Sequence, residues 1–182
     1  MNPAVKQHSV QFQGLLLRAF EESDAAAYVP AAQESIATVG QWMPWCTPAF
    51  SAADALAWFA QCRVDQAAQQ AHEFGVFDAN TGVLLGGAGL NAINDQNRMC
   101  NLGYWVRQSA QRQGVALRVV QALLPYAFDT LGMQRVEIVV ACGNTASEGV
   151  ARKAGAQLEG VARNRLQLHG RAMDASMFSL IP

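Results

Sequence analysis

The chain has 182 residues, 51% of them hydrophobic and 15% charged, and its formal net charge is -1. This length and composition predict one globular domain over residues 1–182 and exclude a disordered chain, which would combine low hydrophobicity with high net charge. The net charge provides no long-range attraction to nucleic acid or to an anionic membrane, so we expect neither as a partner.

The cysteines and histidines signal no metal site and no disulfide framework, because they are scattered without CxxC spacing. The four cysteines are Cys46, Cys62, Cys100 and Cys142. The N-terminus has no apolar stretch of signal-peptide length, and no apolar run approaches the roughly 20 residues that span a bilayer. We therefore expect a reduced, cytoplasmic protein without a metal.

The first half of the chain predicts a strand, two helices and three further strands. The segment 15–20 is strand-like, a helix begins at Ser23 or Asp24 and ends at Gly40, and Ser51 caps an Ala-rich helix over 52–71. Between these helices, WMPWCTP is typical of a stiff aromatic loop. Strands are then expected over 72–78, 83–90 and 100–106, and ANTG is typical of a hairpin turn between the first two.

The second half predicts a long helix, a buried strand, a short helix and a closing hairpin. Apolar residues fall on one helical face over 115–131, Gly132 stops that helix, and Pro125 predicts a kink. The apolar run 135–142 is typical of a central strand, and Asn144 caps a helix that ends near residue 154. The segments QLEGVARNRLQL and RAMDASMFSLI predict an antiparallel hairpin, so the fold class is α/β.

The stretch QRQGVA, residues 111–116, lies between a predicted strand and the long helix. Unpaired N–H groups at a helix N-terminus and the helix dipole make an anion site suited to phosphate. Gly114 lets a ligand approach the backbone, and Ala116 keeps the first turn slim. Arg107, Arg112 and Arg118 could add positive charge. The alternative is that Gly114 only permits a strand-to-helix turn.

The pattern Q-x-x-G-x-A after LGYWV, followed by Asn144 and then S-x-x-V-A-x-K-A-G, resembles the GNAT acetyltransferase superfamily. Within it, the chain resembles the RimJ/RimL branch of ribosomal-protein N-terminal acetyltransferases over nearly its whole length. The resemblance implies a GNAT fold with a mixed, mostly antiparallel sheet of seven strands flanked by helices. It also implies that the fourth and fifth strands splay apart to hold acetyl-CoA.

The resemblance further implies which residues contact acetyl-CoA. Trp105 and Val106, at the end of the splayed fourth strand, would pair with the pantetheine arm, and Asn144 would contact the cofactor edge. The backbone amides that would hold the diphosphate are those of Gln111, Arg112, Gln113, Gly114, Val115 and Ala116. A plainer alternative for Asn144 is a helix cap, and both roles are compatible.

For catalysis, the resemblance implies Ser147 as general acid and Glu159 as general base. The alternatives are a solvent-facing serine in the first helical turn and a surface glutamate on a strand. Ala156 departs from the family pattern, which has an aromatic residue after the glycine, and Pro125 is unusual in the long helix. Trp42 and Trp45 are either packing residues or a wall of the acceptor groove.

The resemblance implies acetyl transfer to a primary amine by direct attack in a ternary complex. An α-amine of pKa near 8 is about a tenth neutral at pH 7, whereas a lysine amine is neutral about once in 2,500. This favours a protein or peptide N-terminal α-amine. Small-molecule amines such as polyamines, aminoglycosides or amino acids remain open as acceptors. A non-catalytic acyl-CoA-binding module is the alternative to an enzyme. The resemblance also leaves open a homodimer.

Overall fold

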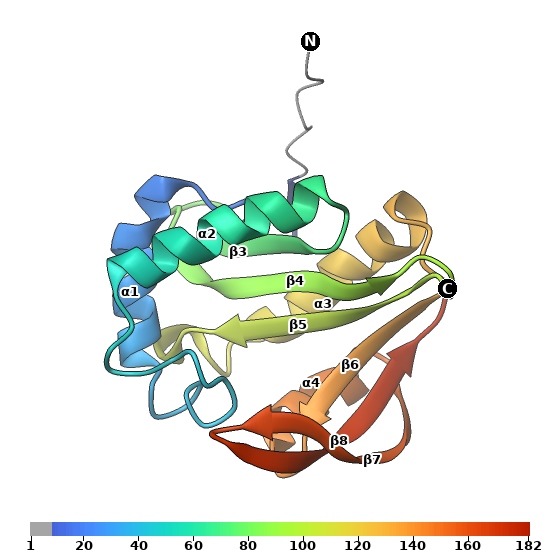
Figure 1. Ribbon diagram of the computed structural model, residues 1–182. Coiled ribbons are helices and arrows are strands. Elements are labelled where there is room, and N and C mark those ends of the chain that lie inside the picture. The colour runs from blue at the N-terminus through green and yellow to red at the C-terminus, as the bar shows by residue number, and fades with distance from the viewer. Residues whose placement is uncertain (1–8) are drawn as a thin grey trace.

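The computed structural model describes residues 9–182, which form one mixed eight-stranded sheet with helices on both faces (Figure 1). The strand order is β1-β2-β3-β4-β5-β6-β8-β7, and only the β5–β6 pair is parallel. The strands are β1 Val10–Phe12, β2 Leu15–Arg18, β3 His72–Asp78, β4 Leu84–Asn94, β5 Met99–Val106, β6 Arg135–Ala141, β7 Gln157–Leu168 and β8 Arg171–Leu180.

The sequence predicted seven strands, and that number is wrong because β1 was missed. This strand has three residues, which is too short for an alternating pattern to be recognised. It pairs antiparallel with β2 through a tight turn in which Gln13 and Gly14 both have positive φ. Such φ values at both central residues match the right-handed twist of a hairpin.

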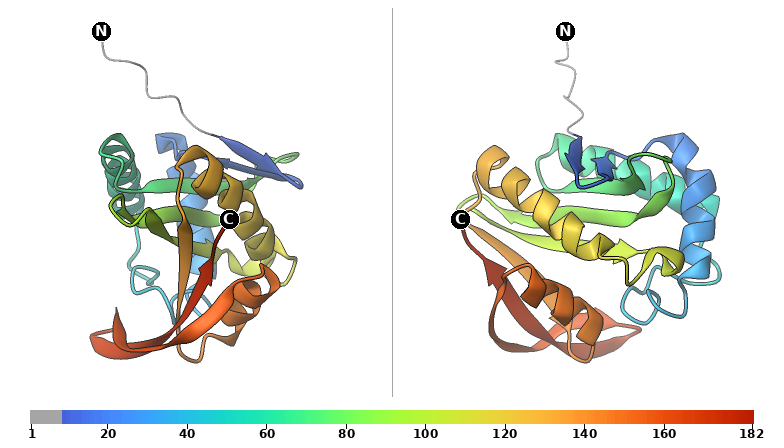
Figure 2. Two further views of the ribbon diagram at one scale, coloured as in Figure 1. Left: turned by 90° about the vertical axis from the view of Figure 1, so that its right-hand side faces the viewer. Right: turned by 180° about the vertical axis from the view of Figure 1, so that it is seen from behind.

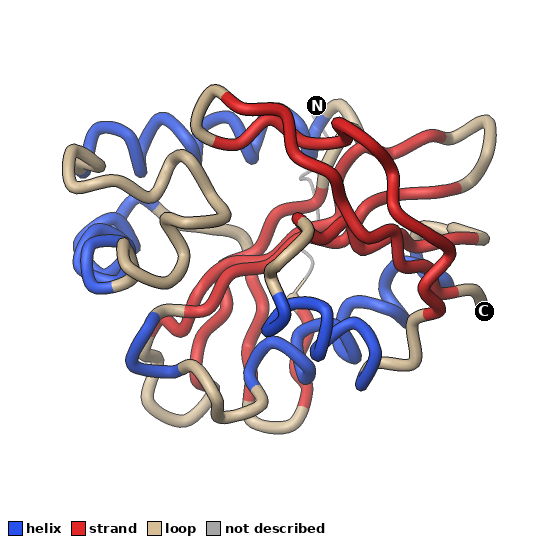
Figure 3. The backbone as a smooth tube through the Cα atoms, turned by 90° about the horizontal axis from the view of Figure 1, so that it is seen from below, coloured by secondary structure: helices blue, strands red, loops and turns tan. Residues whose placement is uncertain are grey.

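Two helices cover each face of the sheet, α1 and α2 on one side and α3 and α4 on the other (Figure 2). Seen from below, helical segments lie on both sides of the strands (Figure 3). The helices are α1 Ala25–Glu34, α2 Ala52–Ala67, α3 Val115–Pro125 and α4 Thr145–Lys153, with short turns η1 Glu22–Asp24, η2 Gln108–Ala110 and η3 Tyr126–Thr130. None of the helices within residues 9–182 has the length and apolar character needed to cross a bilayer.

Two helical predictions are refined by the structure. The helix α1 ends at Glu34 instead of Gly40, and residues 35–42 form turns. Pro125 does not end the long helix, which continues as the π-helical turn η3. Proline has no N–H to donate and its ring displaces the carbonyl one turn back, so the helical ladder widens there. The amide of Leu131 accordingly bonds to the carbonyl of Tyr126, five residues back.

The strands β5 and β6 pair over only three positions and then diverge, as Figure 1 shows. The last pair is Asn101 with Glu137. Beyond it, β5 continues along β4, whereas β6 follows β8 as far as Ala141. Among the described residues, the edge of β5 from Leu102 to Val106 that faces away from β4 therefore has no strand partner. The backbone groups that point to this edge are available to a ligand, except the carbonyl of Val106, which accepts from the side chain of Gln111.

Candidate functional site

The loop after β5 leads into α3 and leaves a row of backbone donors unpaired. Within residues 9–182, the N–H groups of residues 113 to 117 have no hydrogen-bond acceptor. Arg112 and Gly114 have φ values of 61° and 74°, and a Cβ on Gly114 would meet no atom within 4 Å. The donors stand at the positive end of α3, so these residues fit an anionic group such as a diphosphate.

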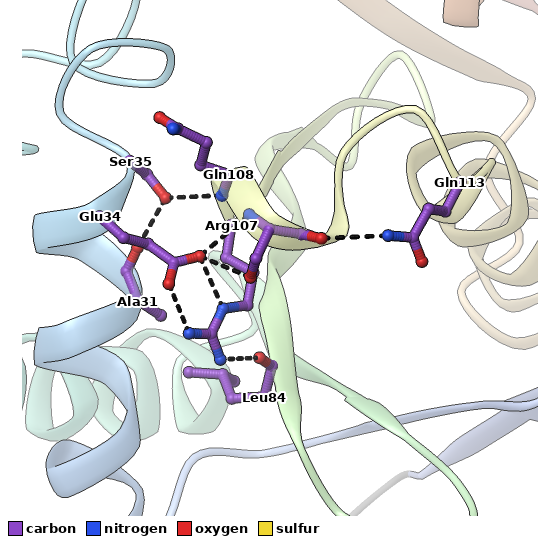
Figure 4. A network of polar contacts seen from close by, with 8 residues as sticks. Ala31, Glu34, Ser35, Leu84, Arg107, Gln108 and Gln113 are labelled. Carbon is purple, nitrogen blue, oxygen red and sulfur yellow. Dashed lines mark hydrogen bonds and ion pairs between the residues drawn. The ribbon is translucent and has the colours of Figure 1, made fainter.

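A polar network holds this loop against α1 (Figure 4). The carboxylate of Glu34 accepts hydrogen bonds from Arg107 Nε at 2.9 Å and Nη2 at 2.7 Å. It also accepts from the amide and the hydroxyl of Ser109 at 3.0 and 2.7 Å. The hydrogen bonds from Arg107 are the main cause that lowers the pKa of Glu34 to about 2. The loop is therefore anchored by an ionised carboxylate.

The three arginines near the loop consequently differ in role. Arg107 is bound by Glu34, and Arg118 donates to the carbonyl of Gln13 at 2.7 Å. Of the three, Arg112 is the one whose guanidinium makes no hydrogen bond or ion pair with the described residues.

The side chain of Gln111 braces the loop. Its Nε2 donates to the carbonyl of Val106 and to Thr38 Oγ1, both at 3.0 Å. Its own N–H donates to the carbonyl of Gln108 at 3.2 Å and so is already used in the turn. Trp105, one residue before Val106, points to the face of the sheet that α1 and α2 cover, and its ring packs against Tyr28. Both predicted strand-end residues thus lie on the unpaired part of β5.

Asn144 and Ser147 lie at the start of α4, directly after the end of β6. Asn144 Oδ1 accepts from the N–H of Ser147 at 3.1 Å, so the predicted helix cap is present. The hydroxyl of Ser147 is 3.0 Å from the hydroxyl of Tyr104 on β5. This contact links β5 to α4, the helix that follows β6. Tyr104 was missed by the sequence analysis, although strand alternation puts it on the face opposite Trp105.

Glu159 is not brought to Ser147. Its carboxylate binds Arg135 Nη1 at 2.7 Å and accepts from Ser179 Oγ at 2.7 Å. Arg135 is at the start of β6 and Ser147 follows its end, and seven residues of strand span roughly 20 Å. The hydrogen bonds from Arg135 are the main cause that lowers the pKa of Glu159 to about 2. Its role as general base stays a prediction.

A cleft of about 900 Å³ opens between the sheet and the α1–α2 side. Its walls are largely aromatic and its floor includes glycines. The lining residues include Tyr28, Trp45, Trp58, Glu73, Asn91 and Trp105. Among the described residues that line it, two are acidic, Asp54 and Glu73, and none is Lys or Arg. Negative charge beside aromatic faces suits a cationic amine.

Trp45 therefore lies in a cleft wall, as one of the two predicted alternatives had it, whereas Trp42 packs beside Gly143 at the end of β6. Glu73 was missed by the sequence analysis. The signal was present in HEFGVFD, where alternation puts Glu73 on the same face as Phe77, a face that is buried. A charged residue on such a face is uncommon without a function or a partner.

Comparison with known proteins identifies the family of the chain. The profile of the acetyltransferase (GNAT) domain matches residues 14–157, which include the loop, the diverging strands and α4. The chain belongs to the GNAT acetyltransferase family. This acyltransferase family was the one indicated by Q-x-x-G-x-A, and the eight-stranded sheet has the GNAT fold.

Individual GNAT proteins give the extent of the likeness. A candidate ribosomal-protein-serine acetyltransferase from Vibrio cholerae has a structure with TM-score 0.87, 32% identity and 100% coverage of both chains. The structure of RimL, a ribosomal L7/L12 α-N-protein acetyltransferase in complex with coenzyme A, has TM-score 0.87 and 26% identity, with 96% of this chain and 98% of that chain covered. N-acetyltransferase p20 of Bacillus licheniformis is 32% identical over 112 residues, which is 62% of this chain and under two thirds, 63%, of that relative.

Proposed function

We propose that this GNAT protein transfers an acetyl group from acetyl-CoA to a primary amine, with a protein or peptide N-terminal α-amine as acceptor. The observation that carries the proposal is the set of unpaired amides at residues 113 to 117, which stands beside the free edge of β5. The similar RimL structure contains coenzyme A, and its name states an α-amine substrate, which supports the same chemistry here.

In this proposal, the amides of residues 113 to 117 and the side chain of Arg112 bind the diphosphate of coenzyme A. The edge of β5 at Trp105 and Val106 pairs with the pantetheine arm through the backbone groups left open there, since the carbonyl of Val106 already accepts from Gln111 Nε2. Asn144 borders the arm from α4. Acetyl-CoA supplies the thioester carbonyl. One backbone N–H of β5 aimed at the carbonyl oxygen would stabilise the charge that develops there by roughly 3–4 kcal/mol.

The hydroxyl pair of Tyr104 and Ser147 supplies the proton for the departing sulfur in this proposal. The two oxygens are 3.0 Å apart, so a proton can pass between them along an existing hydrogen bond. Burial raises the pKa of Tyr104, which keeps its hydroxyl protonated at neutral pH. A thiol of pKa about 8.5 is a good leaving group, so we expect this contribution to be small.

The acceptor reaches the thioester through the aromatic cleft. Trp45, Trp58 and Tyr28 offer ring surface to an amine, and the absence of Lys and Arg from the described lining avoids repulsion of its positive charge. A free α-amine needs less help to become neutral than a lysine amine because its pKa is lower by about 2.4 units. Pairing into a homodimer stays a prediction.

An acceptor panel tests the proposal. Release of free CoA from acetyl-CoA is measured with short peptides that carry a free α-amine, the same peptides with the α-amine blocked but a lysine present, a polyamine and an aminoglycoside. We expect turnover with the free α-amine peptides and little with the blocked ones. Activity confined to polyamines or aminoglycosides contradicts the α-amine acceptor, and coenzyme A binding without any turnover contradicts the enzyme.

A further inference from the structure

Glu73 is the more buried of the two acidic residues that line the cleft. Glu73 lies on β3 and is largely buried, and no ion pair to it exists among the described residues. Its side chain lies across Gly89 of β4, where a Cβ would be only 1.9 Å from Glu73 Oε2. The glycine of β4 at this position leaves room for the carboxylate, which a side chain there would displace.

Two asparagines extend from Glu73 across the sheet. Asn91 Nδ2 donates to Glu73 Oε1 at 3.1 Å, and Asn101 Nδ2 donates to Asn91 Oδ1 at 2.9 Å. Asn101 is the residue at which β5 last pairs with β6, opposite Glu137. The line of side chains therefore runs from the floor of the cleft to the point where the two strands part.

The end of this line is unsatisfied. Asn101 Oδ1 is buried and has no hydrogen-bond partner within residues 9–182. A buried polar atom without a partner costs about 1–3 kcal/mol, so its presence calls for an explanation such as a ligand that donates to it. An amine, which has several N–H donors, is a ligand of this kind.

The backbone beside Asn91 is also distorted. The register between β4 and β5 shifts between Asn91 and Asn94, which marks a β-bulge. Ala92, inside the bulge, has a φ of 50°, which an alanine rarely adopts. Bulges re-aim side chains and are frequent next to active sites, where such strain is retained. Here the bulge directly follows the residue that holds the Glu73 carboxylate.

The groups packed around Glu73 are neutral or acidic. Burial is the main cause that raises the pKa of Glu73, and the hydrogen bond from Asn91 opposes it. Tyr28 of α1 and Cys62 of α2 are neutral near pH 7, because burial also raises their pKa values, and Asp65 of α2 is acidic. Arg63, the arginine of α2, pairs with the carboxylate of Glu22.

We propose that Glu73 binds the ammonium group of the acceptor and takes one of its protons, and that Asn91 and Asn101 position the carboxylate and the amine. This inference rests on the proposed function. One N–H proton moves to the carboxylate, and the nitrogen lone pair forms the C–N bond as the C–S bond breaks. The second proton leaves the nitrogen and replaces the one that the Tyr104–Ser147 hydroxyl pair gives to the sulfur. Glu73 returns its proton to water.

The test is the pH profile of kcat/KM for Glu73→Gln with a peptide that carries a free α-amine. We expect kcat/KM to fall roughly 100-fold at pH 7, the size of a lost general base. We expect the deficit to shrink above pH of about 8, where the amine is already neutral. Coenzyme A affinity and the melting temperature should match the wild type. Asp129→Asn, which changes an exposed carboxylate outside the cleft, should match the wild type throughout.

A second variant keeps the carboxylate but moves it. In Gly89→Ala, the added methyl group displaces the Glu73 carboxylate, and we expect the same pH-dependent deficit in reduced form. An unchanged profile in Glu73→Gln, or a fall of equal size at every pH, overturns the inference. In that case, turnover by the wild type leaves the proposed function standing, whereas a wild type that releases no CoA with any amine overturns both.

Discussion

The two ends of the β5–β6 pair differ in how their polar groups are satisfied. Where the strands part, the amides of residues 113 to 117 have no acceptor among the described residues, and the loop before them is fixed by Glu34 and by the side chain of Gln111. At the closed end, Arg135 bonds to both Glu137 and Glu159, and Ser179 also donates to Glu159. Unpaired groups beside an anchored loop indicate ligand binding, and mutually paired groups indicate a structural role.

The contrast between Glu73 and Glu159 follows the same rule. Burial is the main cause that raises the pKa of Glu73, which has no ion pair among the described residues, whereas the Arg135 guanidinium lowers the pKa of Glu159 to about 2. A carboxylate with a low pKa holds a proton poorly at neutral pH, and one with a raised pKa is a better general base. Residue type and position in a motif do not distinguish these two cases, but the neighbouring charges do.

The largest expected effect on coenzyme A affinity is at the end where β5 and β6 part. In Gly114→Val, a β-branched residue must adopt a φ of 74° and its side chain enters the space beside the free amides. We expect coenzyme A to bind roughly 100-fold more weakly by calorimetry, which corresponds to about 2.7 kcal/mol. Gly82→Val is the matched control, because Gly82 has a φ of 72° and equally open surroundings in the β3–β4 turn. Equal losses in the two variants would contradict the role of the loop.

A smaller effect is expected from the anchor of the loop. Glu34→Gln removes the ionised acceptor of Arg107 and Ser109, and a hydrogen bond to a charged group contributes about 1.5–3 kcal/mol. We expect coenzyme A affinity to fall roughly tenfold if half of that energy orders the loop. Calorimetry at neutral pH measures it. Affinity equal to the wild type would show that the loop keeps its shape without the anchor.

The smallest effect on binding is expected at the closed end. Glu159→Gln removes a carboxylate whose folded-state pKa is lowered, so its stabilisation is present above the unfolded pKa of about 4.5 and is lost as pH falls toward 2. We expect a lower melting temperature at pH 7, a difference that disappears near pH 2, and unchanged coenzyme A affinity. A fall in kcat/KM with an unchanged melting temperature would instead support Glu159 as general base.

The features that can be predicted from the sequence are those that depend on local patterns of residues. The Ser51 cap, the ANTG hairpin and the helix N-terminus at Gly114 each depend on a few adjacent residues, and all are present in the structure. The strand β1 was missed because three residues carry no periodicity. Pro125 was expected to kink the helix, but the π-helical turn that accommodates it depends on local bonding that no pattern reveals.

The polar chemistry of the cleft could not be predicted because its members come from different strands. Glu73 and Asn91 are 18 positions apart, and Asn91 and Asn101 are 10 apart. Likewise, nothing local pairs Glu159 with Arg135, which is 24 positions away and sets its pKa. These contacts follow from strand register, and register depends on the whole sheet.

The most direct measurement is an NMR titration of the ¹⁵N-labelled wild-type protein with coenzyme A, followed through its backbone amides. If the unpaired donors at the start of α3 bind the diphosphate, the resonances of residues 113 to 117 should show the largest shifts and saturate together. Amides at the closed end, such as those of Arg135 and Glu159, should barely move. Saturable binding that leaves residues 113 to 117 unshifted would contradict the account.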